Sequence, residues 1–162
     1  MLFLFSALLV AAADQLSKAW IRSYSEGQII FKAGFVSIIH VNNSGASFGM
    51  LQDKSFFLTI AGFIGILLIL LFTFVISRHS PFLSAVPGKL ALGLVMGGTI
   101  GNLTDRLRFG QVTDFISVSI WPTFNIADSA LTIGVILFVY LFLVSAKAEK
   151  PLPPAVSEEQ SQ

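Results

Sequence analysis

Two aspartates, Asp114 and Asp128, stand fourteen positions apart in the stretch DFISVSIWPTFNIADS, which holds no other charged residue. Two carboxyl groups that lie close together cannot both ionise easily, so one keeps its proton while the other is charged. The charged member can take a proton from water, and the neutral member can donate one to a peptide carbonyl or to the leaving amine. The pair is therefore a candidate for peptide-bond hydrolysis.

A structural interpretation competes with catalysis for the second aspartate. If Asn125 is the N-cap of a helix, Asp128 falls at the third helical position, where a carboxylate stabilises the helix start. Asp114 has no such explanation, because it lies in a segment of mixed pattern between two apolar runs. We expect this segment to be a hinge between two helices that folds Asp114 back against Asp128. The spacing alone leaves catalysis and a structural role both open.

A second charged pair lies near the N-terminus. Ionisable groups at membrane depth cost about 2.5 to 3.5 kcal/mol on insertion scales, so each one is a candidate for function. Asp14 and Lys18 are spaced i, i+4 with the acid first, which favours an ion pair on one helical face. This spacing favours a structural ion pair over a role in positioning a lipid headgroup or bracing a site.

The segment GLVMGGTIGNLTDR places glycines 93, 97 and 101 on one helical face. Small residues at this spacing let a neighbouring helix approach closely. Asn102 shares the glycine face and is expected to point into the bundle. Asp105 and Arg106 follow it, and their position leaves open whether they belong to a site or are charges at the membrane interface.

The composition is that of an integral membrane protein. Of 162 residues, 54% are hydrophobic and 12% are charged, and the mean hydropathy is +0.81. A net charge of +1 without a basic stripe excludes a nucleic-acid partner. The absence of cysteine excludes disulfides, thiol nucleophiles and thiolate metal sites, and two histidines are a poor ligand supply for zinc.

Four apolar runs predict an all-α membrane protein with four transmembrane helices, because a span needs roughly 20 residues. Between the first two runs, alternating residues and turn formers predict a small β element at the membrane face. We expect one membrane-embedded domain over residues 1–146, followed by a disordered, Pro-rich tail over 147–162. The predicted helices cover about 2–20, 56–77, 90–103 and 124–145, and the β element covers about 21–55.

Two further patterns bear on the membrane arrangement. The first run lacks the basic start of a signal peptide, and its apolar face continues past Ala13, so we expect it to remain a helix. An even number of membrane helices, four, puts both termini on one side of the membrane. That side does not hold more Lys and Arg residues than the other side. Charge bias alone therefore does not assign the topology.

Five short blocks occur in order along the chain: DQLSK, NNSGASFG, GNLTDR, VTDF and FNIADS. Together they resemble the lipoprotein signal peptidases, also called signal peptidase II, over most of residues 14 to 140. The resemblance implies an aspartyl endopeptidase whose catalytic dyad is Asp114 and Asp128 and which uses no metal or other cofactor. It also implies that the substrates are diacylglyceryl-modified prolipoproteins, cleaved on the amino side of the modified lipobox cysteine.

The same resemblance assigns further positions. It implies that five residues line a pocket for substrate and for peptide-like antibiotic inhibitors, or support the dyad: Asn43, Gly45, Asn102, Arg106 and Asn125. Asp14 and Lys18 match a charged pair near that pocket, and Ser47 departs from the usual alanine. The resemblance implies a bacterial inner-membrane protein in contact with lipid, with cytoplasmic termini and tail, an extracytoplasmic β element and its site towards the outer leaflet.

Two other functions fit buried acids in a small membrane protein, namely a proton-coupled transporter and a structural membrane subunit. The chain shows no internal repeat of the kind that many transporters have. Its membrane-level acids also gather at one end of the predicted helices instead of forming a path across the bilayer. Both features favour the peptidase.

Overall fold

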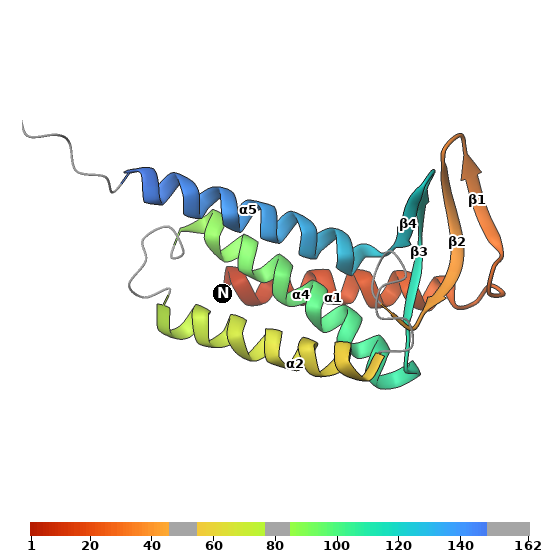
Figure 1. Cartoon of the computed structure of the whole chain (residues 1–162), viewed down its shortest axis with the longest axis horizontal. Coiled ribbons are helices and arrows are strands. Elements are labelled where there is room, and N and C mark those ends of the chain that lie inside the picture. Colours follow the sequence, from red (N-terminus) through yellow and green to blue (C-terminus); the bar gives the residue numbers. More distant parts are fainter. Residues whose placement is uncertain (46–54, 77–84, 149–162) are drawn as a thin grey trace, which may run out of the picture.

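The computed structural model describes residues 1–45, 55–76 and 85–148. Expectations for Ser47 and for the tail beyond residue 148 lie outside these residues. The helices are α1 (Leu2–Ile21), α2 (Ser55–Leu71), which continues into the π-helical turn η2 (Phe72–Ile76), α4 (Val86–Phe109) and α5 (Ile126–Ala148). They run lengthwise beside one another, and a small sheet lies across one end of the bundle (Figure 1).

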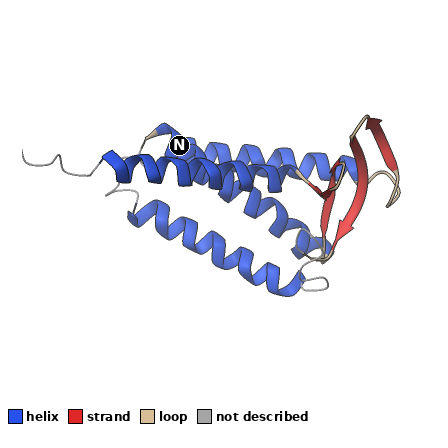
Figure 2. Cartoon of the chain, turned by 45° about the horizontal axis from the view of Figure 1, so that its top comes forward, coloured by secondary structure: helices blue, strands red, loops and turns tan. Residues whose placement is uncertain are grey.

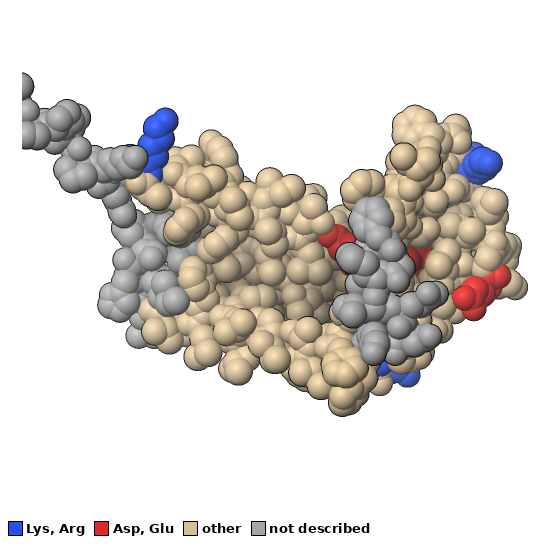
Figure 3. Space-filling model, viewed as in Figure 1, with Lys and Arg blue, Asp and Glu red and all other residues tan. Residues whose placement is uncertain are grey.

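Three of the described helices are long and apolar enough to cross a membrane: Leu2–Ile21, Ser55–Val75 and Ile126–Lys147. Within its described length α2 buries no residue completely: Ile66, Ile69 and Leu70 pack against the core, whereas apolar side chains such as Phe63 and Leu67 are exposed. On the face shown in Figure 3, charged side chains lie towards the two ends of the molecule and the bundle between them is uncharged. This distribution places the molecule in a membrane, with lipid covering the middle of the bundle.

Helix α4 is longer than the 90–103 predicted from hydropathy. Its first turn contains Pro87, which suits a helix start, and it ends at Phe109, followed by Gly110, whose φ of 74° lies in the left-handed region. The predicted end at residue 103 is wrong because Asn102 and Asp105, which reduce the hydropathy of the segment, are buried against protein. These polar side chains never meet lipid, so they do not end the helix.

Glycines in α4 permit its close contact with the neighbouring helices. A methyl group on Gly97 would lie 2.6 Å from the backbone oxygen of Ala7 in α1. One on Gly98 would lie 2.5 Å from the backbone oxygen of Ala127 in α5. The close packing predicted from the glycine spacing is confirmed, and α4 is the central helix against which α1 and α5 pack (Figure 2).

The sheet contains four described strands in the antiparallel order β1-β2-β3-β4. They are β1 (Ile29–Ala33), β2 (Val36–Asn43), β3 (Val112–Val118) and β4 (Trp121–Phe124). The predicted β element over 21–55 therefore supplies only half of the sheet. The other half comes from the segment that was predicted to be a hinge, and Asp114 lies on β3 opposite Val41. The segment is therefore a pair of strands joined to β2 and not a plain hinge, but the predicted return of Asp114 towards Asp128 is confirmed, because both residues line one cavity.

Candidate active site

Asp114 is held on β3 by the side-chain amides of two asparagines. Its Oδ2 accepts a hydrogen bond of 2.8 Å from Asn43 Nδ2, at the end of the neighbouring strand β2. Its Oδ1 accepts one of 2.6 Å from Asn125 Nδ2, at the start of α5. The Gly45 amide donates to Asn43 Oδ1 at 2.9 Å, so the nitrogen of that side chain faces the carboxyl group. Both oxygens of Asp114 are thereby oriented by fixed donors.

Asp128 and Asn125 form a reciprocal cap at the first turn of α5. The Asp128 backbone amide donates to Asn125 Oδ1 at 2.9 Å, and the Asn125 backbone amide donates to Asp128 Oδ2 at 3.3 Å. This is the capping-box arrangement, so the predicted N-cap is confirmed. The cap fixes the position of the Asp128 carboxyl group, and the helix N-terminus stabilises its negative charge.

Asn102 connects the two aspartates through the interior of the bundle. Its Nδ2 donates to Asp128 Oδ1 at 2.7 Å, and its Oδ1 accepts a bond of 3.1 Å from Asn125 Nδ2. Asn125 in turn donates to Asp114, so one chain of amides joins both carboxyl groups. The predicted inward orientation of Asn102 is confirmed.

Both carboxyl groups open onto one cavity of about 260 Å³ between α2, α4, α5 and the sheet. Arg106 lines the same cavity, and its charge interacts with both aspartates. The remaining lining residues are Asn43, Gly45, Gly62, Thr99, Asn102, Leu103, Val112 and Leu131. Figure 3 shows acidic side chains in the hollow between the bundle and the sheet. The cavity thus has polar lining that carries the carboxyl groups and apolar lining from Leu103, Val112 and Leu131.

The two aspartates differ in their surroundings. Asp114 is 2% exposed, whereas Asp128 is partly exposed at the helix start. Burial raises the pKa of the Asp114 carboxyl group to about 7, and the nearby charge of Asp128 acts in the same direction. Hydrogen bonds from Asn43 and Asn125 oppose this rise in the pKa. Near neutral pH, Asp114 is therefore the member suited to hold a proton.

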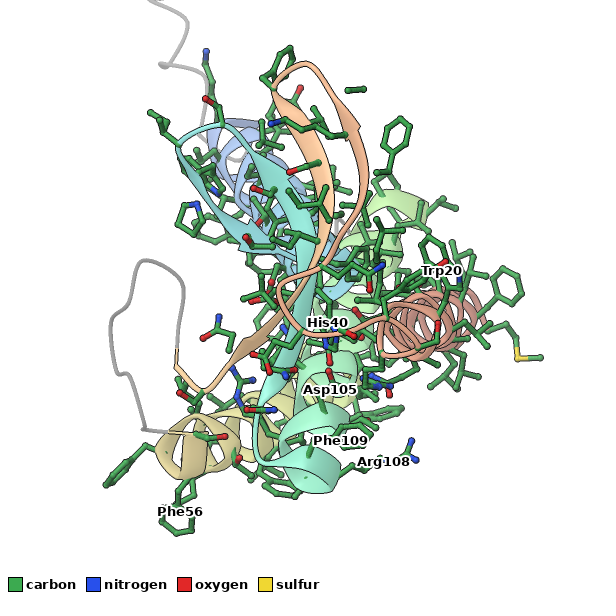
Figure 4. The ribbon with its side chains drawn as sticks, turned by 90° about the vertical axis from the view of Figure 1, so that its right-hand side faces the viewer. Trp20, His40, Phe56, Asp105, Arg108 and Phe109 are labelled. Atoms are coloured by element: carbon green, nitrogen blue, oxygen red, sulfur yellow. The ribbon has the colours of Figure 1, made fainter. Side chains whose placement is uncertain are left out.

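A cluster of buried charges lies behind this site. Lys18 Nζ is 2.8 Å from Asp14 Oδ2 and 3.4 Å from Asp105 Oδ2, and all three side chains are fully buried. Arg22 Nη1 lies 3.3 Å from Asp105 Oδ1. Seen from the sheet end, Asp105 lies centrally between α1, α4 and β3 (Figure 4). The predicted ion pair of Asp14 and Lys18 is confirmed.

This cluster is joined to the backbone on both sides of the candidate dyad. Asp105 Oδ2 accepts a hydrogen bond of 3.0 Å from the amide of Thr113, which precedes Asp114. Asp14 Oδ1 accepts one of 2.9 Å from the amide of Ala127, which precedes Asp128. The cluster therefore fixes β3 and α5 relative to each other.

Comparison with known proteins assigns the chain to a family. A family model described as signal peptidase (SPase) II matches residues 6–144. The chain belongs to the signal peptidase II family. It is 45% identical over 147 residues to a lipoprotein signal peptidase of Dehalococcoides mccartyi, covering 90% of this chain and 91% of that relative. It is 40% identical to one of Moorella thermoacetica, covering 89% and 94%.

A solved structure described as a bacterial membrane enzyme has the same fold as this signal peptidase II family member. It superposes with a TM-score of 0.82 at 31% identity and covers 94% of each chain. A second bacterial membrane enzyme gives a TM-score of 0.75 at 33% identity, covering 87% of this chain and 92% of the other.

In this family member, the structure brings together the residues that the sequence singled out. Six of them line the cavity, namely Asn43, Gly45, Asn102, Arg106, Asp114 and Asp128. Asn125 is buried behind the cavity between the two aspartates, and Asp14 and Lys18 lie one layer further away.

The sequence did not single out Arg22 as part of this cluster, and it left open whether Asp105 belongs to a site or is a charge at the membrane interface. The i, i+4, i+8 spacing of Asp14, Lys18 and Arg22 would have placed all three on one face of α1. The spacing of Asn102 and Asp105 likewise puts both on one face of α4. These two faces pack against each other, and the cluster forms between them.

Proposed function

We propose that this protein is a membrane-embedded aspartyl endopeptidase that removes signal peptides from prolipoproteins, with Asp114 and Asp128 as its catalytic dyad. The observation that carries the proposal is the pair of carboxyl groups held in one cavity by a shared set of asparagines. Membership of the signal peptidase II family supports the same activity.

The surroundings of the two aspartates support distinct roles. Asp128 is the anion that takes a proton from a water molecule as the water oxygen attacks the peptide carbonyl carbon. Asp114 holds the resting proton and donates it to the carbonyl oxygen, which leaves a neutral tetrahedral diol. Asp128 then protonates the leaving nitrogen while Asp114 recovers a proton from a diol hydroxyl, and the C–N bond breaks.

The substrate is a precursor whose lipobox cysteine carries a diacylglyceryl group, cleaved on the amino side of that cysteine. The apolar lining of the cavity, which includes Gly62, Leu103 and Leu131, supports a ligand with a lipid-bearing residue. Asn43 and Arg106 contribute polar groups for the peptide backbone. Peptide-like antibiotic inhibitors of the family and membrane lipids are further proposed ligands of this cavity.

The proposed setting is the bacterial inner membrane, crossed four times by α1, α2, α4 and α5. Helix α4 spans as the central helix, and its 24 residues are long enough for a bilayer. Residues 1–146 act as one catalytic domain with both termini in the cytoplasm. The sheet lies at the end of the bundle away from the N-terminus (Figure 1), so this topology puts the sheet, and the dyad beside it, at the outer leaflet.

Product analysis tests this function. The purified protein is incubated with a diacylglyceryl-modified precursor and with the same precursor lacking the lipid, and mass spectrometry identifies the products. We expect cleavage directly before the modified cysteine and little turnover of the unlipidated chain. Equal turnover of both precursors, or cleavage at another bond, would contradict the proposed substrate. A proton-coupled transporter or a structural subunit would cleave neither.

A further inference from the structure

Lys18 reaches the candidate dyad through one asparagine. The side chain is fully buried, and its described hydrogen bonds and ion pairs go to Asp14, Asp105 and Asn102. Its Nζ donates to Asn102 Oδ1 at 2.9 Å, and Asn102 Nδ2 donates to Asp128 Oδ1 at 2.7 Å. A single amide therefore separates the ammonium group from the carboxyl group of Asp128.

The ammonium group determines which way this amide faces. It has three N–H donors and no acceptor, so the Asn102 atom that faces it must be the oxygen. The nitrogen is then turned towards Asp128, where it can only donate. Asn125 Nδ2 donates to the same oxygen at 3.1 Å, which agrees with this orientation. A cation at one end of the amide also polarises it and strengthens donation at the other end.

We propose that Lys18 is a positioning residue of the peptidase, which holds the Asn102 amide in the orientation that donates to Asp128. This inference rests on the proposed function, because it assumes that Asp128 reacts as an anion. Without the ammonium group, the described contact that still holds the oxygen is the 3.1 Å bond from Asn125 Nδ2, which is shared with Asp114, so the amide can rotate and present its oxygen to Asp128. That arrangement favours a protonated Asp128, so the acid that should accept the proton of water already holds one.

Charge neutralisation alone does not account for this contact. The cluster holds two carboxylates and two cations, since Arg22 pairs with Asp105 while Lys18 contacts both acids. The bond from Lys18 to Asn102 adds nothing to that balance. Among the described residues, the other charged groups near Asp128 are Asp114 on β3 and Arg106 on α4, and both line the cavity with Asp128.

The test removes the ammonium group without leaving an unpaired buried charge, because a lone buried carboxylate destabilises the fold strongly. The variant pair Lys18→Met/Asp14→Asn is compared with Asp14→Asn alone, in which the side-chain oxygen can still accept from Ala127. We expect kcat of the pair to fall about tenfold to a hundredfold relative to Asp14→Asn, the loss of one charge-assisted contact. KM should change by no more than about twofold, because Lys18 does not line the cavity.

A double-mutant cycle separates positioning from a general loss of structure. Asn102→Ala is introduced into Asp14→Asn and into Lys18→Met/Asp14→Asn. If Lys18 acts through Asn102, Asn102→Ala lowers kcat by about tenfold or more in the Asp14→Asn background and by less than about threefold in the Lys18→Met/Asp14→Asn background. Additive losses, or an unchanged kcat in the lysine variant, would overturn the proposal.

Two controls keep the outcome interpretable. Thermal unfolding in detergent establishes that each variant is folded, and Lys18→Leu/Asp14→Asn is a second pair that leaves Asp105 with Arg22, for which the same cycle must show the same coupling. The proposed function fails separately, if Asp114→Asn or Asp128→Asn retains full turnover. If the aspartate variants are inactive but the losses in kcat from the lysine and Asn102→Ala substitutions are additive, the role of Lys18 is contradicted and the proposed function stands.

Discussion

Asn125 combines two functions that a single substitution can separate. Its Oδ1 caps α5, and its Nδ2 donates to Asp114 and to Asn102. Serine is as good an N-cap as asparagine but lacks the amide donor, whereas alanine lacks both. We therefore expect Asn125→Ser to keep the cap but to lower kcat by about tenfold or more, and to reduce the unfolding free energy by about 1 to 3 kcal/mol because the buried oxygens of Asp114 and Asn102 lose a donor.

Alanine at the same position is the matched comparison. Asn125→Ala should lower kcat similarly and reduce the unfolding free energy by about 1 kcal/mol more than serine does. Turnover and thermal unfolding in detergent measure both effects. Full activity of Asn125→Ser would show that the amide contacts to the dyad are dispensable.

The pKa of Asp114 predicts the alkaline side of the pH profile. Burial raises this pKa to about 7, so the carboxyl group is protonated below that pH and ionises as the pH rises through it. The proposed mechanism needs this proton, because Asp114 donates it to the substrate carbonyl. We expect kcat/KM to fall about tenfold per pH unit above roughly pH 7, with the midpoint assigned to the dyad as a unit. A profile that stays flat to pH 9 would exclude Asp114 as the acid.

At the scale of elements, close approach of α4 to α1 depends on glycine. A methyl group on Gly97 would lie 2.6 Å from the Ala7 backbone oxygen and 2.7 Å from Val10 Cβ. Since these atoms belong to a neighbouring helix, the helices must separate to admit it. Gly97→Ala should reduce the unfolding free energy by about 1 to 3 kcal/mol, measured by thermal unfolding in detergent.

Gly65→Ala in α2 is the control for that substitution. A methyl group there would lie 4.0 Å from Thr99 Cγ2, which is an ordinary contact. Alanine also has the higher helix propensity, so the change should be neutral or stabilising by up to about 1 kcal/mol. An equal loss of unfolding free energy in Gly65→Ala and Gly97→Ala would contradict the prediction that close approach of α4 to α1 depends on Gly97.

The sequence predicted the helices better than the sheet, for a physical reason. Lipid-facing helices such as α2 and α5 are apolar along their length, so hydropathy alone locates them. The C-terminal end of α4 was missed because Asn102 and Asp105 face protein. The sheet depends on pairing between β2 and β3, whose residues Asn43 and Val112 are far apart in sequence. Neither strand alone specifies its partner or its register.

The candidate site was predictable only in part for the same reason. The cap of Asp128 is local, so Asn125 and its spacing were enough to predict it. The contacts of Asp114 come from β2 and α5, and no spacing within its own segment indicates them. The blocks that resemble signal peptidase II located these residues, and the structure explains their proximity through the sheet and the amide network.

At the scale of the whole molecule, the sheet and the far end of α5 must lie on opposite sides of the membrane if the proposed topology holds. The chain has no cysteine, so single cysteines can be introduced on a clean background. Ile120, which is 99% exposed in the turn between β3 and β4, marks the sheet, and Lys147 marks the other end. A membrane-impermeant maleimide should label Ile120→Cys in intact spheroplasts, and Lys147→Cys only after permeabilisation. The reverse pattern would contradict cytoplasmic termini.

The most direct test of the account is turnover of a diacylglyceryl-modified precursor by wild type, Asp114→Asn and Asp128→Asn, each verified as folded. Asparagine keeps the shape of each side chain but can neither exchange the proton nor carry the charge. We predict that each variant loses at least about a thousandfold in kcat, since the two carboxyl groups act as one unit. Wild-type turnover by either folded variant would contradict an aspartyl dyad at this site.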